Sequence, residues 1–281
     1  MTTGPYPQIV FSGGGLRCFW QGGFMNVVRD PLGLDPARIT GVSGGGLGSA
    51  AFIAHRGHKL LRTMQAAFAE NPGNVEWHEP REVTGLTPHQ EIYREVAEEV
   101  LDAEAIEAIA NGPAYQVLIG HPPGDGRLSG TAATLAYEAE LHLINAPHFN
   151  WAEKVGVTST LVDARAAARD GRLIDLVVAA ATIPPIFTPP EWDGKPVIDG
   201  GMADQAPMPE PDEGPTLILL TRRYRNIPEI AGRHYIWPSE AVPVDKIDFT
   251  DPDALQKAWD AGEEDGRDFL KDNQNHTEEE T

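Results

Sequence analysis

The chain alternates between short apolar stretches and glycine-rich turns, and this pattern is clearest near the N-terminus. The apolar run Ile9-Val10-Phe11 leads through Ser12 into three glycines. The segment that follows has apolar residues at helical spacing, which predicts a helix with a largely buried face. Residues 38–42 form a second apolar run, and a stretch of small apolar residues, 44–54, comes after it. Two strand–turn–helix units in succession predict an α/β domain with parallel strands.

The later part of the chain continues this alternation. Strands are expected at residues 115–119, 197–198 and 216–220, and helices at 173–182 and 253–270. A further helix is expected to begin with Pro88 in its first position, after the capping residue Thr87, and to run as one element to the stop signal Asn111-Gly112. Residues 131–150 fit either a helix or a strand.

These elements predict an α/β fold in one domain, residues 1–271, with three layers: a mainly parallel central sheet flanked by helices. The chain has 281 residues, of which 41% are hydrophobic, and this is enough for one sizeable core. Residues 272–281 are polar and acidic, and they are expected to form a disordered tail.

The charge balance limits the partners of this protein. It has 22 basic and 42 acidic residues, which give a formal net charge of −20. No basic patch is evident in the sequence, so nucleic acid is not expected as a partner. The same charge repels anionic membranes, so membrane contact is expected to be transient at most. The oligomeric state cannot be read from the sequence.

The sequence favours a cytoplasmic protein. Its N-terminus lacks a basic segment followed by an apolar stretch, and no run approaches the roughly 18 apolar residues of a spanning helix. Cys18 is the only cysteine, so no intrachain disulfide can form. Export by a route that needs no signal peptide stays open.

The first candidate for chemistry is the pentapeptide Gly41-Val42-Ser43-Gly44-Gly45, which lies between a predicted strand and a predicted helix. It has the Gly-x-Ser-x-Gly form of a nucleophile elbow, in which a serine is held on a sharp and strained turn. The glycines Gly41, Gly44 and Gly45 leave room for that turn. The N-terminal N–H groups of the following helix can stabilise negative charge next to the serine.

Two further glycine motifs accompany the elbow. Gly13-Gly14-Gly15 ends a predicted strand, and its backbone N–H groups can converge on an oxyanion. A phosphate-binding loop and a purely structural turn are the rival interpretations, although a dinucleotide loop requires glycine where Cys18 stands and the Walker pattern is absent. Asp199-Gly200-Gly201 follows a short predicted strand, which would hold a carboxylate rigidly, but in isolation such a sequence is usually only a turn.

Together the three motifs resemble the patatin-like phospholipase family in their order and spacing. The similarity extends to residues 179–189, ahead of Asp199, and to residues 202–207, where the family commonly has Asn at the position of Gln205. It covers about residues 8–55 and 175–210. The resemblance implies an acyl ester hydrolase that acts on lipids or other carboxylic esters. No cofactor is expected, and the histidine pairs 55/58 and 142/148 have no carboxylate at a spacing that would indicate a metal site.

By this resemblance, Ser43 is the nucleophile and Asp199 is its base, in a dyad without histidine that works through an acyl-enzyme. A carboxylate with an ordinary pKa is a weak base for a serine. Either burial raises the pKa of the carboxyl group, or a short contact between the two side chains compensates.

The resemblance also assigns the oxyanion hole to Gly13, Gly14 and Gly15, with Arg17 near it, and it gives Gly200 and Gly201 a supporting role after Asp199. The family usually has glycine where this chain has Cys18. This departure at the start of the helix leaves the role of Arg17 open.

Two alternatives to a catalytic dyad remain at this stage. Ser43, Asp199 and His234 follow one another in the order of an α/β-hydrolase triad, which would make His234 the base. The protein would otherwise be a catalytically silent member that binds a lipid or a protein partner. Trp192, in a proline-rich segment before Asp199, is a candidate for the wall of an acyl pocket, with simple packing as its other interpretation.

Overall fold

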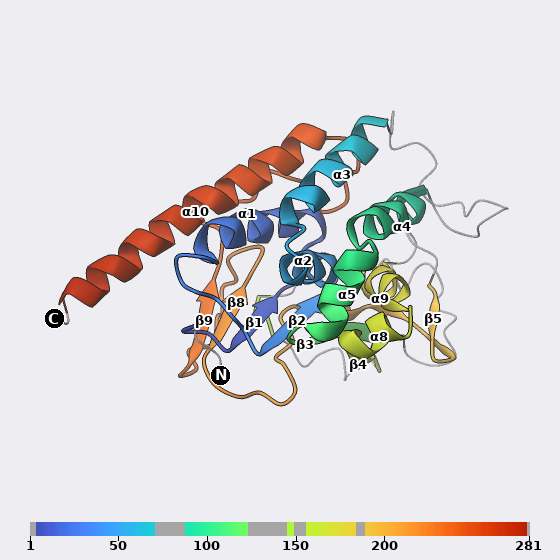
Figure 1. The fold of residues 1–281 in the computed structure, drawn as a ribbon, viewed down its shortest axis with the longest axis horizontal. Helices are drawn as coiled ribbons and strands as arrows, with labels where there is room; N and C mark the ends of the chain where they lie inside the picture. Colours follow the sequence, from blue (N-terminus) through green and yellow to red (C-terminus); the bar gives the residue numbers. More distant parts are fainter. Residues whose placement is uncertain (1–3, 71–87, 123–144, 149–155, 184–188, 280–281) are drawn as a thin grey trace.

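The computed structural model describes residues 4–70, 88–122, 145–148, 156–183 and 189–279. At the centre of the molecule lies a mixed, mostly parallel sheet with helices packed against it, which confirms the predicted α/β class (Figure 1). The strands are β1 (Gln8–Phe11), β2 (Arg38–Val42), β3 (Ala114–His121), β4 (Thr158–Asp163), β5 (Glu191–Trp192), β6 (Lys195–Pro196), β7 (Ile198–Asp199), β8 (Thr216–Leu219) and β9 (Arg233–Ile236).

The α-helices of the described part are α1 (Cys18–Val28), α2 (Gly44–Ile53), α3 (Gly57–Glu70), α4 (Pro88–Val100), α5 (Ala103–Asn111), α8 (Ala164–Arg169), α9 (Leu173–Ala180) and α10 (Pro252–Glu279). Two short 3-10 helices, η1 (Gly15–Arg17) and η2 (Gly200–Met202), follow β1 and β7. Helix α10 lies along α1 on the outside of the helical layer (Figure 1).

The main sheet has the strand order β4-β3-β2-β1-β8-β9, and β7 pairs with one end of β3. Strands β3, β2, β1, β8 and β9 are mutually parallel, whereas β4 and β7 run antiparallel to β3. In this register Phe11 lies beside Gly41 on one side and Leu219 on the other. The turns that follow β1 and β2 therefore meet at one edge of the sheet, where ligands bind in open α/β folds.

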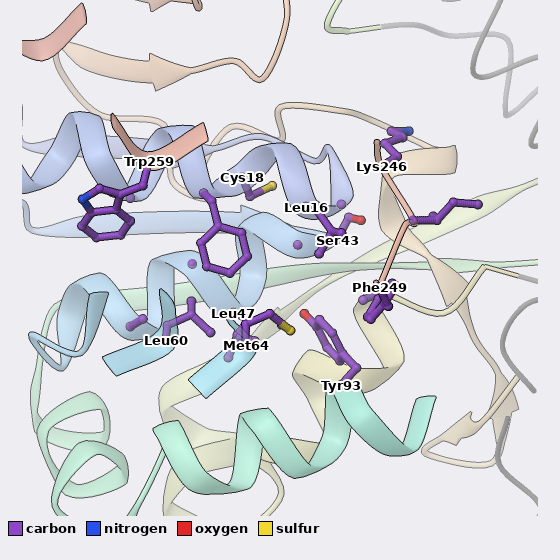
Figure 2. A pocket seen from close by; sticks show the side chains of 18 of the residues that line it. Leu16, Cys18, Ser43, Leu47, Leu60, Met64, Tyr93, Lys246, Phe249 and Trp259 are labelled. Carbon is purple, nitrogen blue, oxygen red and sulfur yellow. The ribbon is translucent and has the colours of Figure 1, made fainter. Parts of the chain in front are cut away.

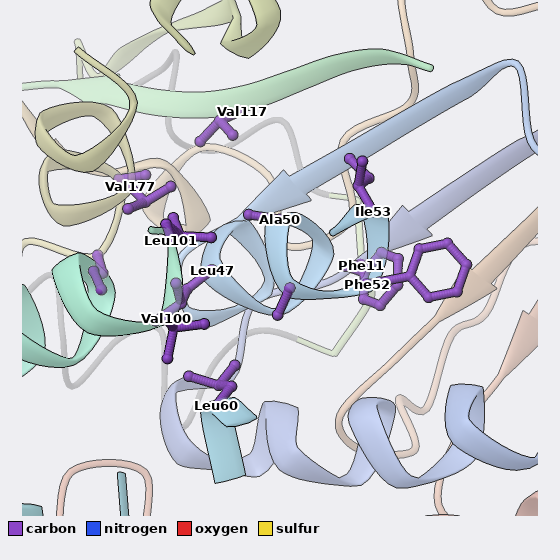
Figure 3. Close-up of a cluster of buried hydrophobic side chains, with 14 of the residues drawn as sticks. Phe11, Leu47, Ala50, Phe52, Ile53, Leu60, Val100, Leu101, Val117 and Val177 are labelled. Atoms are coloured by element: carbon purple, nitrogen blue, oxygen red, sulfur yellow. The ribbon is translucent and has the colours of Figure 1, made fainter. Parts of the chain in front are cut away.

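One face of the sheet carries the main hydrophobic core. Strand residues such as Phe11 and Val117 point into it, and the buried helix α2 lies at its centre, with α3, α4 and α9 contributing side chains around it (Figure 3). Helix α2 is apolar on all sides, which is expected for a helix enclosed by protein. This packing holds the N-terminus of α2 rigidly at the edge of the sheet.

The opposite face of the sheet has a smaller core. Val10 and Ile218 lie on it and pack against Ala206 and Tyr224. These last two residues belong to irregular segments that follow η2 and β8. Thr40 on the same face donates a hydrogen bond to the Pro207 carbonyl, 2.6 Å away, and this anchors the segment that follows η2.

Two expectations about helices need correction. The single helix predicted from Pro88 to residue 110 is two helices, because the Asp102 side chain accepts a hydrogen bond from the Ala105 N–H and caps a new helix there. Helix α10 continues to Glu279, where a disordered tail was expected from residue 272. No proline or glycine interrupts residues 272–279, so nothing in the local sequence stops the helix.

The remaining predicted elements agree with the structure within one to three residues at each end. The ambiguous stretch 131–150 lies outside the described residues except for 145–148, which form no helix or strand. Among the helices that the structure describes, none is both long and apolar enough to span a lipid bilayer.

Candidate active site

Ser43 occupies the turn between β2 and α2, in a backbone conformation that serine rarely adopts. Its φ and ψ are 54° and −136°, outside the regions that residues with a Cβ favour. The neighbouring glycines allow this turn to sit close to its surroundings: a Cβ at Gly45 would lie 2.5 Å from the Phe11 carbonyl oxygen, and one at Gly44 would lie 2.6 Å from the Gly15 carbonyl oxygen. The sequence interpretation of a nucleophile elbow fits this geometry.

Ser43 and Asp199 are in direct contact. The Ser43 hydroxyl donates a hydrogen bond of 2.6 Å to Oδ2 of Asp199, and the two residues are only 6% and 3% exposed. The other carboxylate oxygen, Oδ1, accepts a hydrogen bond from the Gly201 N–H at 2.7 Å. Both oxygens of the carboxylate are therefore fixed, with one aimed at the serine.

Strand β3 brings the two residues together. It pairs with β2 on one side, and at its far end it pairs with β7, so that Ile119 lies opposite Asp199. Gly200 allows this approach, because a Cβ there would overlap the Leu118 carbonyl oxygen. The Asp199 N–H donates a 2.7 Å hydrogen bond to the Thr182 carbonyl, which fixes the start of the turn.

The glycine loop after β1 lies against the elbow, since a Cβ at Gly13 would be 3.3 Å from the Cβ of Ser43. Gly13 itself does not fit the predicted role of oxyanion donor, because its N–H donates to the Gln205 carbonyl at 2.9 Å. In the part of the chain that the structure describes, the Gly14 and Gly15 N–H groups have no such partner. The candidate donors are therefore Gly14 and Gly15, together with the first N–H groups of α2.

Glycine is needed at both remaining loop positions. A Cβ at Gly14 would overlap the Thr221 side chain. Gly15 has a φ of 56°, and a Cβ there would overlap the Lys246 carbonyl oxygen. Neither position has room for a side chain, which keeps the backbone of the loop accessible beside Ser43.

Arg17 is tied to another segment. Its Nε donates a hydrogen bond to the Val244 carbonyl at 3.4 Å. Its place beside a developing oxyanion stays a prediction.

Cys18, at the start of α1, is buried, and its Sγ donates a hydrogen bond to the Ser12 carbonyl at 3.5 Å. Burial raises the pKa of this thiol, so it is neutral at physiological pH.

An apolar pocket, partly open to solvent, extends from Ser43 (Figure 2). Its walls come from η1, α1, α2, α3 and α4, with Ile247, Phe249 and Trp259 from the C-terminal part. Tyr93 also lines it, and burial raises the pKa of its hydroxyl group well above the usual value. Trp192, which the sequence made a candidate for this wall, does not line the pocket and instead packs under the guanidinium of Arg172 at 3.9 Å.

The structure contradicts the triad alternative. His234 lies on β9, three strands away from β2, which corresponds to about 14 Å at a strand spacing of about 4.8 Å. In the sheet register it is level with Leu217, two residues before the end of β8, and its ring forms a hydrogen bond with the Tyr6 hydroxyl at 2.8 Å.

Among the described residues, no three side chains of His, Cys, Asp or Glu lie close enough together to bind a metal ion.

Three polar side chains stabilise the backbone around the site, and none of them was assigned a role there from the sequence. Gln205 donates to the Gly201 carbonyl at 2.7 Å, Thr221 donates to the Gly13 carbonyl at 2.7 Å, and Gln21 donates to the Ser12 and Leu219 carbonyls at 3.1 and 2.8 Å. Each of them fixes the backbone next to a glycine motif. In the sequence, a polar residue within an otherwise apolar element, such as Gln21 in α1, could have indicated this supporting role.

A serine in a strained elbow, paired with a buried carboxylate at the edge of a mostly parallel sheet, defines a candidate serine hydrolase site on an α/β fold. A family model described as patatin-like phospholipase matches residues 9–212. The chain therefore belongs to the patatin-like phospholipase family. The matched region contains the three glycine motifs and the Ser43–Asp199 pair.

A search of curated proteins gives no match to this chain. Among solved structures, the fold is similar to that of VipD from Legionella pneumophila, with a TM-score of 0.48 and 13% sequence identity. The alignment covers 96% of this chain and 68% of VipD.

Proposed function

We propose that this protein hydrolyses carboxylic esters of lipids with Ser43 as the nucleophile and Asp199 as the base. The observation that carries the proposal is the 2.6 Å hydrogen bond from the Ser43 hydroxyl to a buried Asp199 carboxylate. Hydrogen bonds from a hydroxyl to a charged carboxylate are short and strong, and such a bond provides a direct path for proton transfer from the serine. Membership in a family of phospholipase-like proteins supports lipid acyl hydrolysis as the class of reaction.

The first step would form an acyl-enzyme. As Oγ of Ser43 attacks the ester carbonyl carbon, its proton passes to Oδ2 of Asp199 and the carbonyl oxygen becomes an oxyanion. The N–H groups of Gly14 and Gly15 and the N-terminus of α2 would stabilise that charge. The protonated Asp199 then gives its proton to the leaving alcohol oxygen as the C–O bond breaks.

In the second step, water would hydrolyse the acyl-enzyme. A water molecule attacks the acyl carbon while Asp199 accepts one of its protons, and a new oxyanion forms in the same place. The bond between the acyl carbon and Oγ of Ser43 breaks, and the proton returns to Oγ. The products are a carboxylic acid and free enzyme, so no cofactor is consumed.

The test combines covalent labelling with hydrolysis of a short-chain nitrophenyl ester. A fluorophosphonate should label the wild-type protein at Ser43, and both Ser43→Ala and Asp199→Asn should lower kcat/KM by about 10⁴-fold or more. His234→Ala is the matched control, because His234 lies away from the site, and it should retain activity within about twofold. Activity that persists in Asp199→Asn would refute the dyad.

The same experiment tests the alternative that the protein binds lipid but has no catalytic activity. A folded protein that binds lipid but neither reacts with the fluorophosphonate nor hydrolyses any ester would show that the site is not catalytic. Circular dichroism of each variant establishes that loss of activity is not loss of folding.

A further inference from the structure

The apolar pocket that begins at Ser43 ends at the indole of Trp259. It follows the groove between α1 and α2, and Figure 2 shows Trp259 at the opposite end from Ser43, with Leu60 of α3 on the wall between them. Trp259 comes from α10, the helix that lies over α1, and it is only 3% exposed. The far wall of the pocket is therefore a single large side chain from a distant part of the chain.

A second cavity, also partly open, is lined by the same indole. It continues along the same two helices and has Met25 and Arg29 of α1 and Phe52 of α2 in its walls. The two cavities share the residues Gly22, Gly48, Ala51, Gly57 and Trp259. Four of these five have small or no side chains, so the Trp259 ring is the bulky group at the junction.

Several contacts hold the ring in this position. Its Nε1 donates a 2.9 Å hydrogen bond to Glu263, one turn further along α10, and the His58 ring packs against it with centroids 4.8 Å apart. A Cβ at Gly22 would lie 2.6 Å from Cζ3 of the ring, and one at Gly57 would lie 3.2 Å from Cη2. The indole is thus seated on two glycines and tied by a hydrogen bond.

The distance from the nucleophile to this wall corresponds to a medium-length acyl chain. The pocket runs along α2 from Gly44 to Ala51, seven residues, which is about 10 Å at about 1.5 Å per residue. An extended chain advances about 1.2 Å per bond, so about eight bonds fit between Ser43 and the indole. A chain of about eight to ten carbons would fill the pocket.

We propose that Trp259 sets the acyl-chain specificity of this protein and limits it to chains of about eight to ten carbons. The inference rests on the proposed function, because it takes Ser43 as the point where the acyl group is attached. Each buried CH₂ group contributes about fourfold to affinity, so chains shorter than the pocket bind less well and longer ones meet the indole. Without the indole, the two cavities join into one longer channel along α1 and α2.

Two variants change the length of the pocket in opposite directions. Trp259→Ala opens the pocket into the second cavity. Gly48→Leu fills it, since Gly48 lies in α2 within the wall of both cavities and a Cβ there would have no atom within 4 Å. Trp237→Ala is the matched control, because Trp237 packs in the small core on the other face of the sheet.

The measurement is kcat/KM for nitrophenyl esters of 4, 8, 12 and 16 carbons. In wild type and Trp237→Ala, we expect the maximum at 8 carbons. Trp259→Ala should raise the ratio of the 16-carbon to the 8-carbon ester at least tenfold, and Gly48→Leu should lower the ratio of 8 to 4 carbons at least tenfold. Unchanged ratios in both variants, or a wild-type maximum at 16 carbons, would overturn the proposal.

A binding measurement separates this proposal from the proposed catalysis. Alkanoates of 8 and 16 carbons are titrated into Ser43→Ala and into the double variant Ser43→Ala, Trp259→Ala. Selective binding of the 8-carbon acid that is lost in the double variant supports the pocket assignment even if no ester is hydrolysed, in which case only the proposed function fails. Equal selectivity of the two proteins overturns the role of Trp259 whatever the hydrolysis assays show.

Discussion

The backbone at Ser43 leads to a prediction about stability that is independent of any substrate. With φ at 54° and ψ at −136°, a residue that carries a Cβ is strained, and such strain costs about 1–3 kcal/mol. Glycine relieves it. Ser43→Ala and Ser43→Gly both remove the hydrogen bond to Asp199, so that loss cancels when the two variants are compared with each other.

The size of the difference follows from two opposing terms. Glycine at this position avoids the strain, but it loses about 0.5–1 kcal/mol more backbone entropy on folding than alanine does. Ser43→Gly should therefore be more stable than Ser43→Ala by about 0.5–2 kcal/mol, which corresponds to about 1–3 °C in Tm for a chain of 281 residues. Thermal unfolding of both variants, followed by calorimetry, measures this difference.

Ser49, in the interior of the helix that follows Ser43, provides the control. It is fully buried in α2, and its hydroxyl donates to the Gly45 carbonyl at 2.7 Å. In a helix interior alanine is more stable than glycine by about 1 kcal/mol, so Ser49→Ala should unfold at a higher temperature than Ser49→Gly. The order of alanine and glycine should thus reverse between positions 49 and 43. Equal or greater stability of Ser43→Ala would refute the claim that the elbow is strained.

Four further predictions concern residues around the site and its scaffold. Gly200→Ala should fail to accumulate as folded protein or lose many degrees in Tm, because the new Cβ overlaps the Leu118 carbonyl; thermal unfolding shows this. Gln205→Ala should lower both Tm and ester hydrolysis, since it removes the 2.7 Å bond to Gly201, and a melt and an esterase assay give the two values. Cys18 should react with a thiol reagent at pH 8 only slowly until denaturant is added, because burial raises its pKa. A hydrogen bond from the Lys59 side chain, and to a smaller extent one from the Ala105 N–H, lowers the pKa of Asp102 to about 2. The charged Asp102 therefore stabilises the fold above about pH 4, the ordinary carboxyl range, and this contribution is lost as the pH falls through about 2. The Tm difference between wild type and Asp102→Asn should shrink accordingly, and a constant difference down to pH 2 would contradict this.

Local patterns predicted the central strands β1, β2, β3 and β8 and the helices α1, α2, α9 and α10, but not α3, α8, β4 or β9. Strands such as β1 and β2 and helices such as α1 and α2 depend on apolar spacing within a few residues and on glycine turns, and both can be read directly from the sequence. The break between α4 and α5 was missed because the apolar spacing continues across it. Only the side chain of Asp102, which caps α5, shows where the second helix begins.

The sequence by itself determined the elbow, the glycine loop and the Asp-Gly-Gly turn, and the resemblance to a family linked Ser43 with Asp199. The tertiary structure decided which groups meet. The Ser43–Asp199 hydrogen bond joins residues 156 positions apart through the pairing of β7 with β3. The Gln205 carbonyl accepts a hydrogen bond from the Gly13 N–H, so the remaining candidate donors of the loop are the N–H groups of Gly14 and Gly15.

The pocket shows the same division between local and distant determinants. The small residues of α1 and α2 that open it are visible in the sequence, but its end is formed by Trp259, which reaches the groove only because α10 packs along α1. His234 follows Asp199 in the chain, yet the order of strands in the sheet places it far from Ser43. Contacts between residues distant in sequence depend on how whole elements pack, and no local pattern of side chains encodes that packing.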